Sequence, residues 1–272
     1  MPVLLSKYEG TMINVSFFEL LGMFAIPFFS ILIPILAGQH YGLLVRNKSG
    51  KVNDSPVGSV VGAALGLLAF MLAFTFQIVD SRYNNRKELL LEEVTTIRTA
   101  YLQSGLIPEP YRSSSRDLLK EYTDMRVNLF KDLSVKKIEN LRERSQTILD
   151  SLWGYSEALA AQDRSSEAYS LYTGSINELV DTYNKRVTFT FEYRLPATIL
   201  WVLFIITLFT MLILGYQFGI SGKKNHVLAV FISIIFSSVM FLILALDRPE
   251  TGIMQLNQAP METLYKQLHS KK

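Results

Sequence analysis

The stretch Gly58–Phe74, GSVVGAALGLLAFMLAF, contains no charged residue. It forms the centre of an apolar run over residues 57–79, and a helix needs about 20 residues to cross the ~30 Å hydrocarbon core of a bilayer. Because glycine costs about 1 kcal/mol relative to alanine inside a helix, its repetition here requires an explanation. The small residues recur at three- and four-residue spacing: Gly58, Gly62, Gly66, Ala69 and Ala73. In lipid, such spacing lets helix backbones approach closely, so the stretch predicts a transmembrane helix with a packing face.

Three further apolar runs are long enough to span a bilayer, and they cover residues 17–40, 197–218 and 227–246. Pro27 and Pro34 interrupt the first run, but proline is tolerated in membrane helices whose neighbours satisfy the freed carbonyls. The chain is 49% hydrophobic and has a positive mean hydropathy. The sequence therefore predicts an all-α membrane protein with four transmembrane helices.

Charged residues concentrate between the second and third spans. Residues 80–194 hold 17 of the 27 Lys and Arg and 18 of the 24 Asp and Glu. Apolar residues recur there at the three- and four-residue spacing of amphipathic helices, and Pro108 and Pro110 separate the first helix from the second. We expect a soluble helical bundle inserted between spans two and three, with a packed core rather than a cofactor pocket. Ser114, Ser134 and Ser166 are the expected starts of its later helices.

The predicted domains are an N-terminal segment with spans one and two (1–79), the soluble helical domain (80–195), spans three and four (196–246) and a C-terminal tail (247–272). Four spans place both termini and the soluble domain on one side. More Lys and Arg lie near the span ends on that side than in the two short loops, which favours a cytoplasmic location. We expect an integral protein of the bacterial inner membrane. Whether the tail docks on the domain or on the membrane stays open.

Composition excludes several classes of chemistry. The chain has no cysteine, which removes disulfides and thiolate chemistry, and its net charge of +3 is too small to suggest nucleic acid. His40, His226 and His269 are isolated, so we predict no metal site. Neither a nucleophile elbow nor a complete phosphate-binding loop is present. We therefore expect neither an enzyme nor a cofactor.

Five segments, taken in order, resemble the bestrophin-like domain family: LGLLAFMLAFTF, RYNNRKELLLEEVTTIRTAYL, GLIPEPYR, EYTDMR and ALDRPETG. The resemblance covers residues 58–252. It implies distant similarity to bestrophins, which are oligomeric chloride channels whose pore is lined by the second span, and five subunits follow from this analogy alone. The family positions it implies are Glu93, Thr99, Ala100, Tyr101, Pro108, Tyr122, Arg126, Asp247, Arg248, Pro249 and Gly252.

The second span has two faces in a helical projection. The small-residue face ends at Gln77 and would pack helices within one subunit or between subunits. The other face contains Leu67, Phe70, Met71, Phe74 and Ile78. If several second spans surround an axis, a ring of phenylalanines forms a hydrophobic constriction that gates by dewetting. We predict a pore neck at Phe70 and Phe74, with Gln77 as a further pore-lining candidate.

Polar residues cluster at the span ends on the domain side: Asp80, Arg82, Arg86, Arg194, Asp247 and Arg248. They could form a belt of ion pairs, such as Asp80 with Arg248 or Arg82 with Asp247. Alternatively, their surplus of positive charge forms a vestibule that concentrates anions.

Two functions therefore remain in view. One is an oligomeric channel that conducts anions or other small ions, and the other is a membrane-anchored helical sensor or scaffold without conduction. A homo-oligomer in a lipid bilayer is expected in either case.

Overall fold

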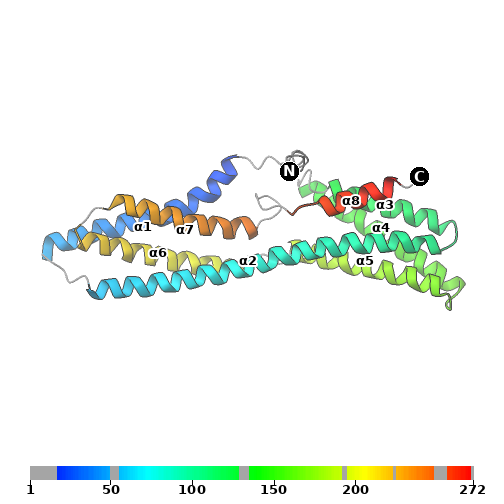
Figure 1. Ribbon diagram of the computed structural model, residues 1–272, viewed down its shortest axis with the longest axis horizontal. Coiled ribbons are helices and arrows are strands. Elements are labelled where there is room, and N and C mark those ends of the chain that lie inside the picture. Colours follow the sequence, from blue (N-terminus) through cyan, green and yellow to red (C-terminus); the bar gives the residue numbers. More distant parts are fainter. Residues whose placement is uncertain are drawn as a thin grey trace, which may run out of the picture. The chain divides into compact units, whose positions relative to one another are not determined.

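The structure is a computed structural model that describes residues 17–49, 55–128, 135–191, 195–222, 225–247 and 256–270. Within these ranges the regular structure is entirely helical, which confirms the predicted all-α class (Figure 1). The helices are α1 (Phe17–Ser49), α2 (Ser55–Gln103), the short 3-10 helix η1 (Ser104–Leu106), α3 (Tyr111–Asn128), α4 (Val135–Gln162), α5 (Glu167–Phe191), α6 (Ala197–Ile220), α7 (His226–Asp247) and α8 (Ala259–Ser270).

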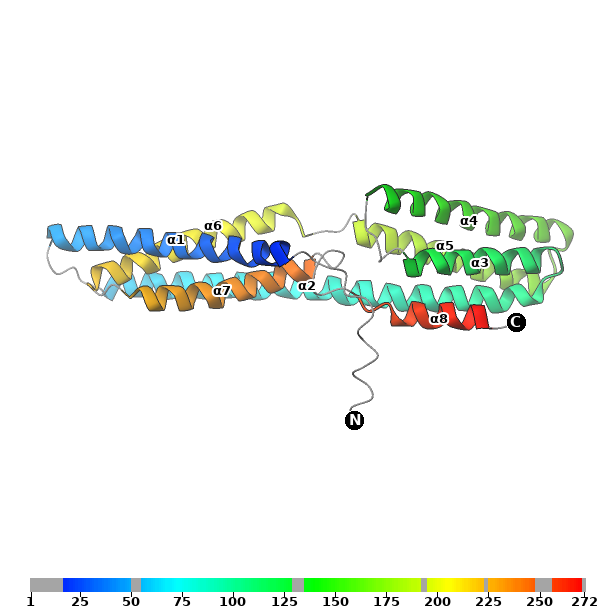
Figure 2. The same ribbon diagram turned by 90° about the horizontal axis from the view of Figure 1, so that it is seen from above.

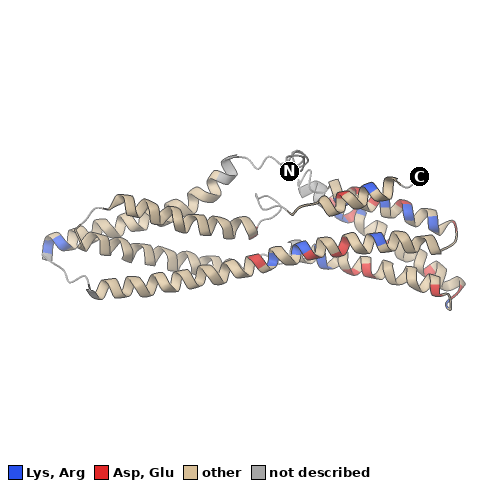
Figure 3. Ribbon diagram, viewed as in Figure 1, with Lys and Arg blue, Asp and Glu red and all other residues tan. Residues whose placement is uncertain are grey.

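Four segments are long and apolar enough to cross a membrane, as predicted: Leu21–Lys48, Pro56–Leu106, Ala197–Ile220 and His226–Asp247. The charges of the described residues follow the same division. Among the described residues, α6 and the first half of α2 hold no Lys, Arg, Asp or Glu, and α7 holds only its last residue, Asp247, whereas the second half of α2 and helices α3 to α5 carry many (Figure 3).

The chain forms two compact units. The membrane unit comprises the described residues of 14–83 and 194–254, and the bundle unit comprises those of 84–193 and 255–272. Helix α2 contributes to both. The sequence does not indicate whether the C-terminal tail docks on the soluble domain or on the membrane. The structure places α8 in the bundle unit, where Met261, Leu264 and Leu268 are buried and α8 packs against α3.

In the membrane unit, α1 packs against both α6 and α7 (Figures 1 and 2). Glycines allow the closest of these approaches. A Cβ added at Gly42 would lie 2.9 Å from the Cα of Gly219, and one added at Gly219 would lie 2.7 Å from the Cα of Gly42. One turn along, Gly38 faces the backbone of Leu212, and Gly215 faces that of Ile35. The two helices thus meet through a glycine pair on each, at the four-residue spacing that suits helix packing in lipid.

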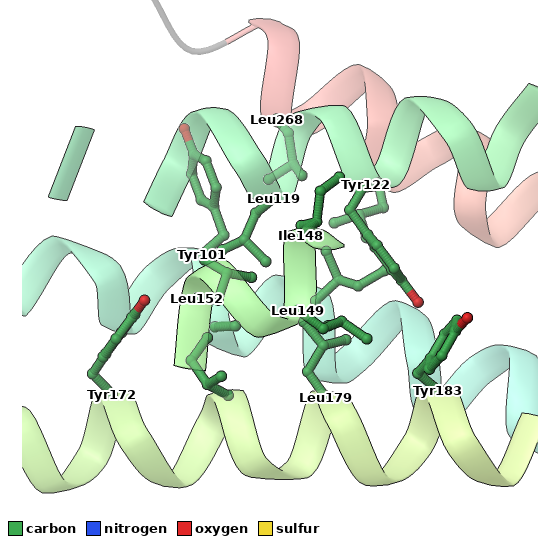
Figure 4. Close-up of a cluster of buried hydrophobic side chains, with 14 of the residues drawn as sticks. Tyr101, Leu119, Tyr122, Ile148, Leu149, Leu152, Tyr172, Leu179, Tyr183 and Leu268 are labelled. Atoms are coloured by element: carbon green, nitrogen blue, oxygen red, sulfur yellow. The ribbon is translucent and has the colours of Figure 1, made fainter. Parts of the chain in front are cut away.

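The bundle unit has a core of aliphatic and tyrosine side chains (Figure 4). The predicted apolar stripes supply most of it, since their three- and four-residue spacing places one face of each helix inward. Fully or nearly fully buried are Leu90, Ile97, Tyr101, Tyr122, Ile148, Leu152, Leu159, Tyr172, Ile176, Leu179 and Tyr183. Val94, Leu118, Met125, Tyr155 and Tyr169 are partly buried at its margin.

Two expected helix starts can be checked. The Tyr169 backbone N–H donates to the Ser166 hydroxyl at 3.4 Å, and α5 begins at Glu167, so that prediction is confirmed. The start at Ser114 is wrong, because α3 begins at Tyr111. The Glu109 carboxylate accepts from the Ser113 backbone N–H at 3.1 Å and from its hydroxyl at 2.8 Å, so it caps the first turn instead. Ser134 lies outside the described residues.

Candidate functional site

The first half of α2 has one broad exposed face in the single chain. Phe70 is 66% exposed and Phe74 is 49% exposed. The small residues Gly62, Gly66, Ala69 and Ala73 are exposed beside them, together with Gln77. The opposite face is buried in the membrane unit through Val61, Leu68, Leu72, Thr75 and Val79. The predicted small-residue and aromatic faces are therefore adjoining parts of one surface, except that Met71 and Ile78 pack partly against the core.

The glycines of this face are not filled by neighbours in the same chain. A Cβ added at Gly62 or Gly66 would meet no described atom within 4 Å, and at Gly58 it would meet only the Gln217 Nε2 at 3.1 Å. Packing between copies of the chain therefore stays a prediction for Gly62 and Gly66. Sequence reasoning overlooked the glycines that pack α1 on α6, although GQHYG and GYQFG show the same four-residue spacing inside apolar runs.

The exposed faces of the other apolar helices differ in composition. On α6 and α7 they carry large apolar side chains, including Trp201, Phe209, Phe231 and Ile235, each more than half exposed. Such surfaces suit contact with lipid chains. The exposed face of α2 carries Val60 and Leu67 as well, but it combines them with glycine, alanine, two phenylalanines and a glutamine. Glycine and alanine favour helix approach in lipid, so this face suits contact with protein or an aqueous path better than lipid.

Among the polar residues at the span ends, Asp247 has a defined contact. Its Oδ1 accepts a hydrogen bond from the Leu195 backbone N–H at 3.1 Å, which ties the end of α7 to the residues that precede α6. Asp80 and Arg82 are half-buried, and Arg86 is buried. Arg194 and Arg248 lie outside the described residues, so the pairing of Asp80 with Arg248 stays a prediction. The pairing of Arg82 with Asp247 also stays a prediction.

A second group of polar residues lies inside the bundle unit and centres on Glu93 of α2. Its side chain is fully buried, and the Tyr122 hydroxyl donates to its Oε1 at 2.6 Å. The Arg126 Nε lies 2.9 Å from the same oxygen, and the Arg126 Nη2 donates to Oε2 at 3.2 Å. Arg186 of α5 forms an ion pair with Oε2. One carboxylate thus joins α2 to α3 and α5.

Burial governs the protonation of this cluster. It lowers the pKa of Arg186 to about 9, while the adjoining Glu93 carboxylate opposes that decrease. Desolvation also raises the pKa of Tyr122 to about 12, and the positive charge of Arg126 acts in the opposite direction. At neutral pH Arg186 therefore keeps its positive charge and Tyr122 stays a neutral phenol. Removing the carboxylate would leave two buried positive charges without their shared partner.

Three positions implied by the family resemblance, Glu93, Tyr122 and Arg126, thus meet in one cluster. Arg186 was missed. The signal was available, because Arg186 continues the spacing of Leu179 and Tyr183 and so falls on the buried face of α5. Among the described residues, no group of three or more His, Cys, Asp or Glu side chains could hold a metal ion.

Solved structures share this fold. A bacterial bestrophin homolog from Klebsiella pneumoniae aligns with a TM-score of 0.63 at 18% identity, over 89% of this chain and 97% of its own. A variant of a bacterial bestrophin homolog from the same organism gives 0.64 at 19% identity, over 90% and 98%. A variant described as a membrane protein gives 0.65 at 18% identity, over 89% and 97%. A comparison with curated proteins found no match.

The family comparison covers most of the chain. The model of the bestrophin-like domain matches residues 30–261, which include all four apolar helices in whole or in part and the bundle helices α3 to α5. Together with those apolar helices, the match identifies an integral membrane protein. The chain belongs to the bestrophin-like domain family.

Proposed function

We propose that this chain assembles into a homo-oligomeric membrane channel for anions or other small ions, with the exposed face of α2 arranged around its axis. Membership of the bestrophin-like family supports a channel at the level of the family. The observation that carries the assignment to α2 is that its broad exposed face includes glycine, alanine and glutamine beside Val60, Leu67 and the two phenylalanines, whereas the exposed faces of α6 and α7 are mainly bulky and apolar.

In this arrangement the phenylalanines form the neck. Phe70 and Phe74 are one helical turn apart, so copies of both around an axis produce two neighbouring apolar rings. An apolar constriction resists hydration and closes by dewetting rather than by a steric plug. Gln77 supplies amide groups at the next turn, where a permeating ion regains polar contacts. Gly62 and Gly66 leave room for a neighbouring helix.

The span-end residues would form the vestibule. Four arginines and two aspartates are proposed to meet at the membrane plane on the side of the bundle, a surplus of positive charge that raises the local anion concentration. We place the bundle and both termini in the cytoplasm of a bacterial cell. Protease accessibility in inverted membrane vesicles checks this orientation.

The test is ion flux through purified protein in liposomes or planar bilayers. The unsubstituted protein should conduct, and Phe74→Ala should increase the conductance or the open fraction, because it widens and hydrates the neck. The matched control is Phe231→Ala on α7, which removes an exposed phenylalanine from the face assigned to lipid. Unchanged flux in Phe74→Ala, with normal assembly, would contradict the neck. An intact oligomer without any ion flux would favour the scaffold function instead.

A further inference from the structure

The second half of α2 exposes a stripe of four residues on the bundle unit. Lys87, Leu91, Arg98 and Leu102 follow one another at spacings of four and seven residues, which places them on one side of the helix. Leu91 is 46% exposed and Leu102 is 54% exposed. The stripe therefore combines two exposed leucines with two positive charges, and we call it the basic stripe.

Helix α5 exposes a stripe of opposite charge. Leu171, Gly174, Glu178 and Asp181 are exposed at alternating spacings of three and four residues. Leu171 is 52% exposed, and a Cβ added at Gly174 would meet no described atom within 4 Å. This acidic stripe thus has one exposed leucine, an open glycine position where a helix can approach, and two carboxylates.

Arg98 of the basic stripe and Glu178 of the acidic stripe have no ion-pair partner in the described part of the chain. Asp181 accepts a hydrogen bond from Asn177 at 3.4 Å, whereas no ion pair of Arg98 or Glu178 is recorded there. Each stripe therefore carries free charge of the sign that the other requires.

The register of α2 against α5 places these charges at one level along the bundle. Glu92 Oε1 lies 3.3 Å from Lys185 Nζ, and η1 contacts α5, so the two helices run antiparallel from that ion pair. Arg98 lies six residues beyond Glu92, and Glu178 lies seven residues before Lys185. At ~1.5 Å per residue these separations are about 9 Å and about 10.5 Å. In an assembly whose symmetry axis runs along the helices, the rotation that relates two copies does not shift a residue along that axis. Arg98 of one copy and Glu178 of the next therefore lie at matching heights.

We propose that the basic stripe of α2 is a docking surface for a second copy of this chain, which it contacts through the acidic stripe of that copy's α5. Arg98 pairs with Glu178 at the centre, and Leu102 and Leu171 supply apolar contact toward the end of the bundle remote from the Glu92–Lys185 pair. The surface lies entirely within the bundle unit. It goes beyond the proposed conduction and does not depend on it, because the tests below measure assembly.

Charge reversal tests the pairing. Arg98→Glu and Glu178→Lys should each shift the dissociation of the detergent-solubilised oligomer to a roughly tenfold higher protein concentration, since like charges then oppose each other in every interface. The double variant should recover most of that loss. Glu157→Lys, at an exposed position of α4, should leave assembly unchanged. Native mass spectrometry over a dilution series gives the distribution of species. If both single variants assemble normally, or if the double variant shows no recovery, the proposal is overturned.

Crosslinking provides a measurement with less perturbation. The natural chain lacks cysteine, so single introduced thiols react without background. Copies with only Leu102→Cys and copies with only Leu171→Cys are co-expressed and treated with a short bis-maleimide. The mixture should yield crosslinked dimers several-fold more efficiently than the pair Leu102→Cys and Trp153→Cys, whose second site lies on α4. Equal yields from the two pairs would contradict the docking surface even if a charge variant failed to fold.

Discussion

Replacing Glu93 by glutamine should destabilise the protein far more than any surface charge change of the same kind. The Glu93 side chain is 0% exposed, and those of Arg126 and Arg186 are 9% and 7% exposed. Removing one partner of a buried ion pair costs about 3–5 kcal/mol because the remaining charge is left without compensation. For a chain of this size that corresponds to a decrease in Tm of roughly 6–20 °C.

The matched control is the neighbouring position. Glu92 forms an ion pair with Lys185 at 3.3 Å, but the two side chains are 39% and 57% exposed. Because solvent screens such a pair, Glu92→Gln should cost at most about 1 kcal/mol. Both variants lose one carboxylate and gain one amide from adjacent positions of the same helix. The comparison therefore isolates burial.

The pH dependence gives a second readout. Burial lowers the pKa of Arg186 to about 9, and in Glu93→Gln no carboxylate opposes this decrease. An unfolded arginine keeps its proton past about pH 12, so above the folded pKa of Arg186 the unfolded state binds more protons than the folded state and the free energy of unfolding rises with pH. Without the carboxylate this pKa is lower in Glu93→Gln than in the natural protein, so the rise begins at a lower pH in the variant. The defect of Glu93→Gln relative to the natural protein should therefore be smaller at about pH 9.5 than at pH 7. Thermal unfolding in detergent at both pH values measures it, and a Tm equal to that of Glu92→Gln would refute the reasoning.

Two further substitutions test the packing. Gly215→Ala should destabilise the fold by about 1–3 kcal/mol, because the added Cβ would overlap the Ile35 backbone. Gly62→Ala should leave the fold intact, because its added Cβ would meet no described atom within 4 Å. Thermal unfolding in detergent compares the two variants, and equal melting temperatures would contradict the α1–α6 contact. Leu264→Ala, at a position 2% exposed, should cost about 2–5 kcal/mol and increase hydrogen exchange in α3, since α8 packs there. Unchanged exchange would mean that α8 does not protect α3.

Periodicity predicted the helices well because burial imposes it. The stripe through Leu90, Ile97 and Tyr101 has the helical spacing, and these side chains form part of the bundle core. The start of α3 was misplaced because a serine near an aspartate resembles a capping box, whereas the structure caps the helix with Glu109, a carboxylate after a proline. The sequence pattern alone does not decide between the serine and Glu109 as the capping residue, because both lie within a few residues of the same turn.

The candidate site was less accessible to sequence reasoning. The four-residue spacing of glycines in Gly58–Phe74 indicates a packing face. The same spacing occurs in the pairs Gly38 and Gly42 and Gly215 and Gly219, and these are the glycines that pack α1 on α6. Spacing identifies residues that permit close approach, while the identity of the partner depends on tertiary contacts between distant segments. Arg186 illustrates the same limit, because its place on the buried face follows from periodicity but its pairing with Glu93 does not.

Thiol modification along α2 tests most directly whether its exposed face surrounds a conducting axis. Single cysteines at positions 70, 74 and 77 are introduced into this cysteine-free chain, with one at position 231 of α7 as the control. A charged, water-soluble thiol reagent should change the current at Phe74→Cys and Gln77→Cys and leave Phe231→Cys unaffected. Currents that respond at position 231 but not at 74 or 77 would contradict the account.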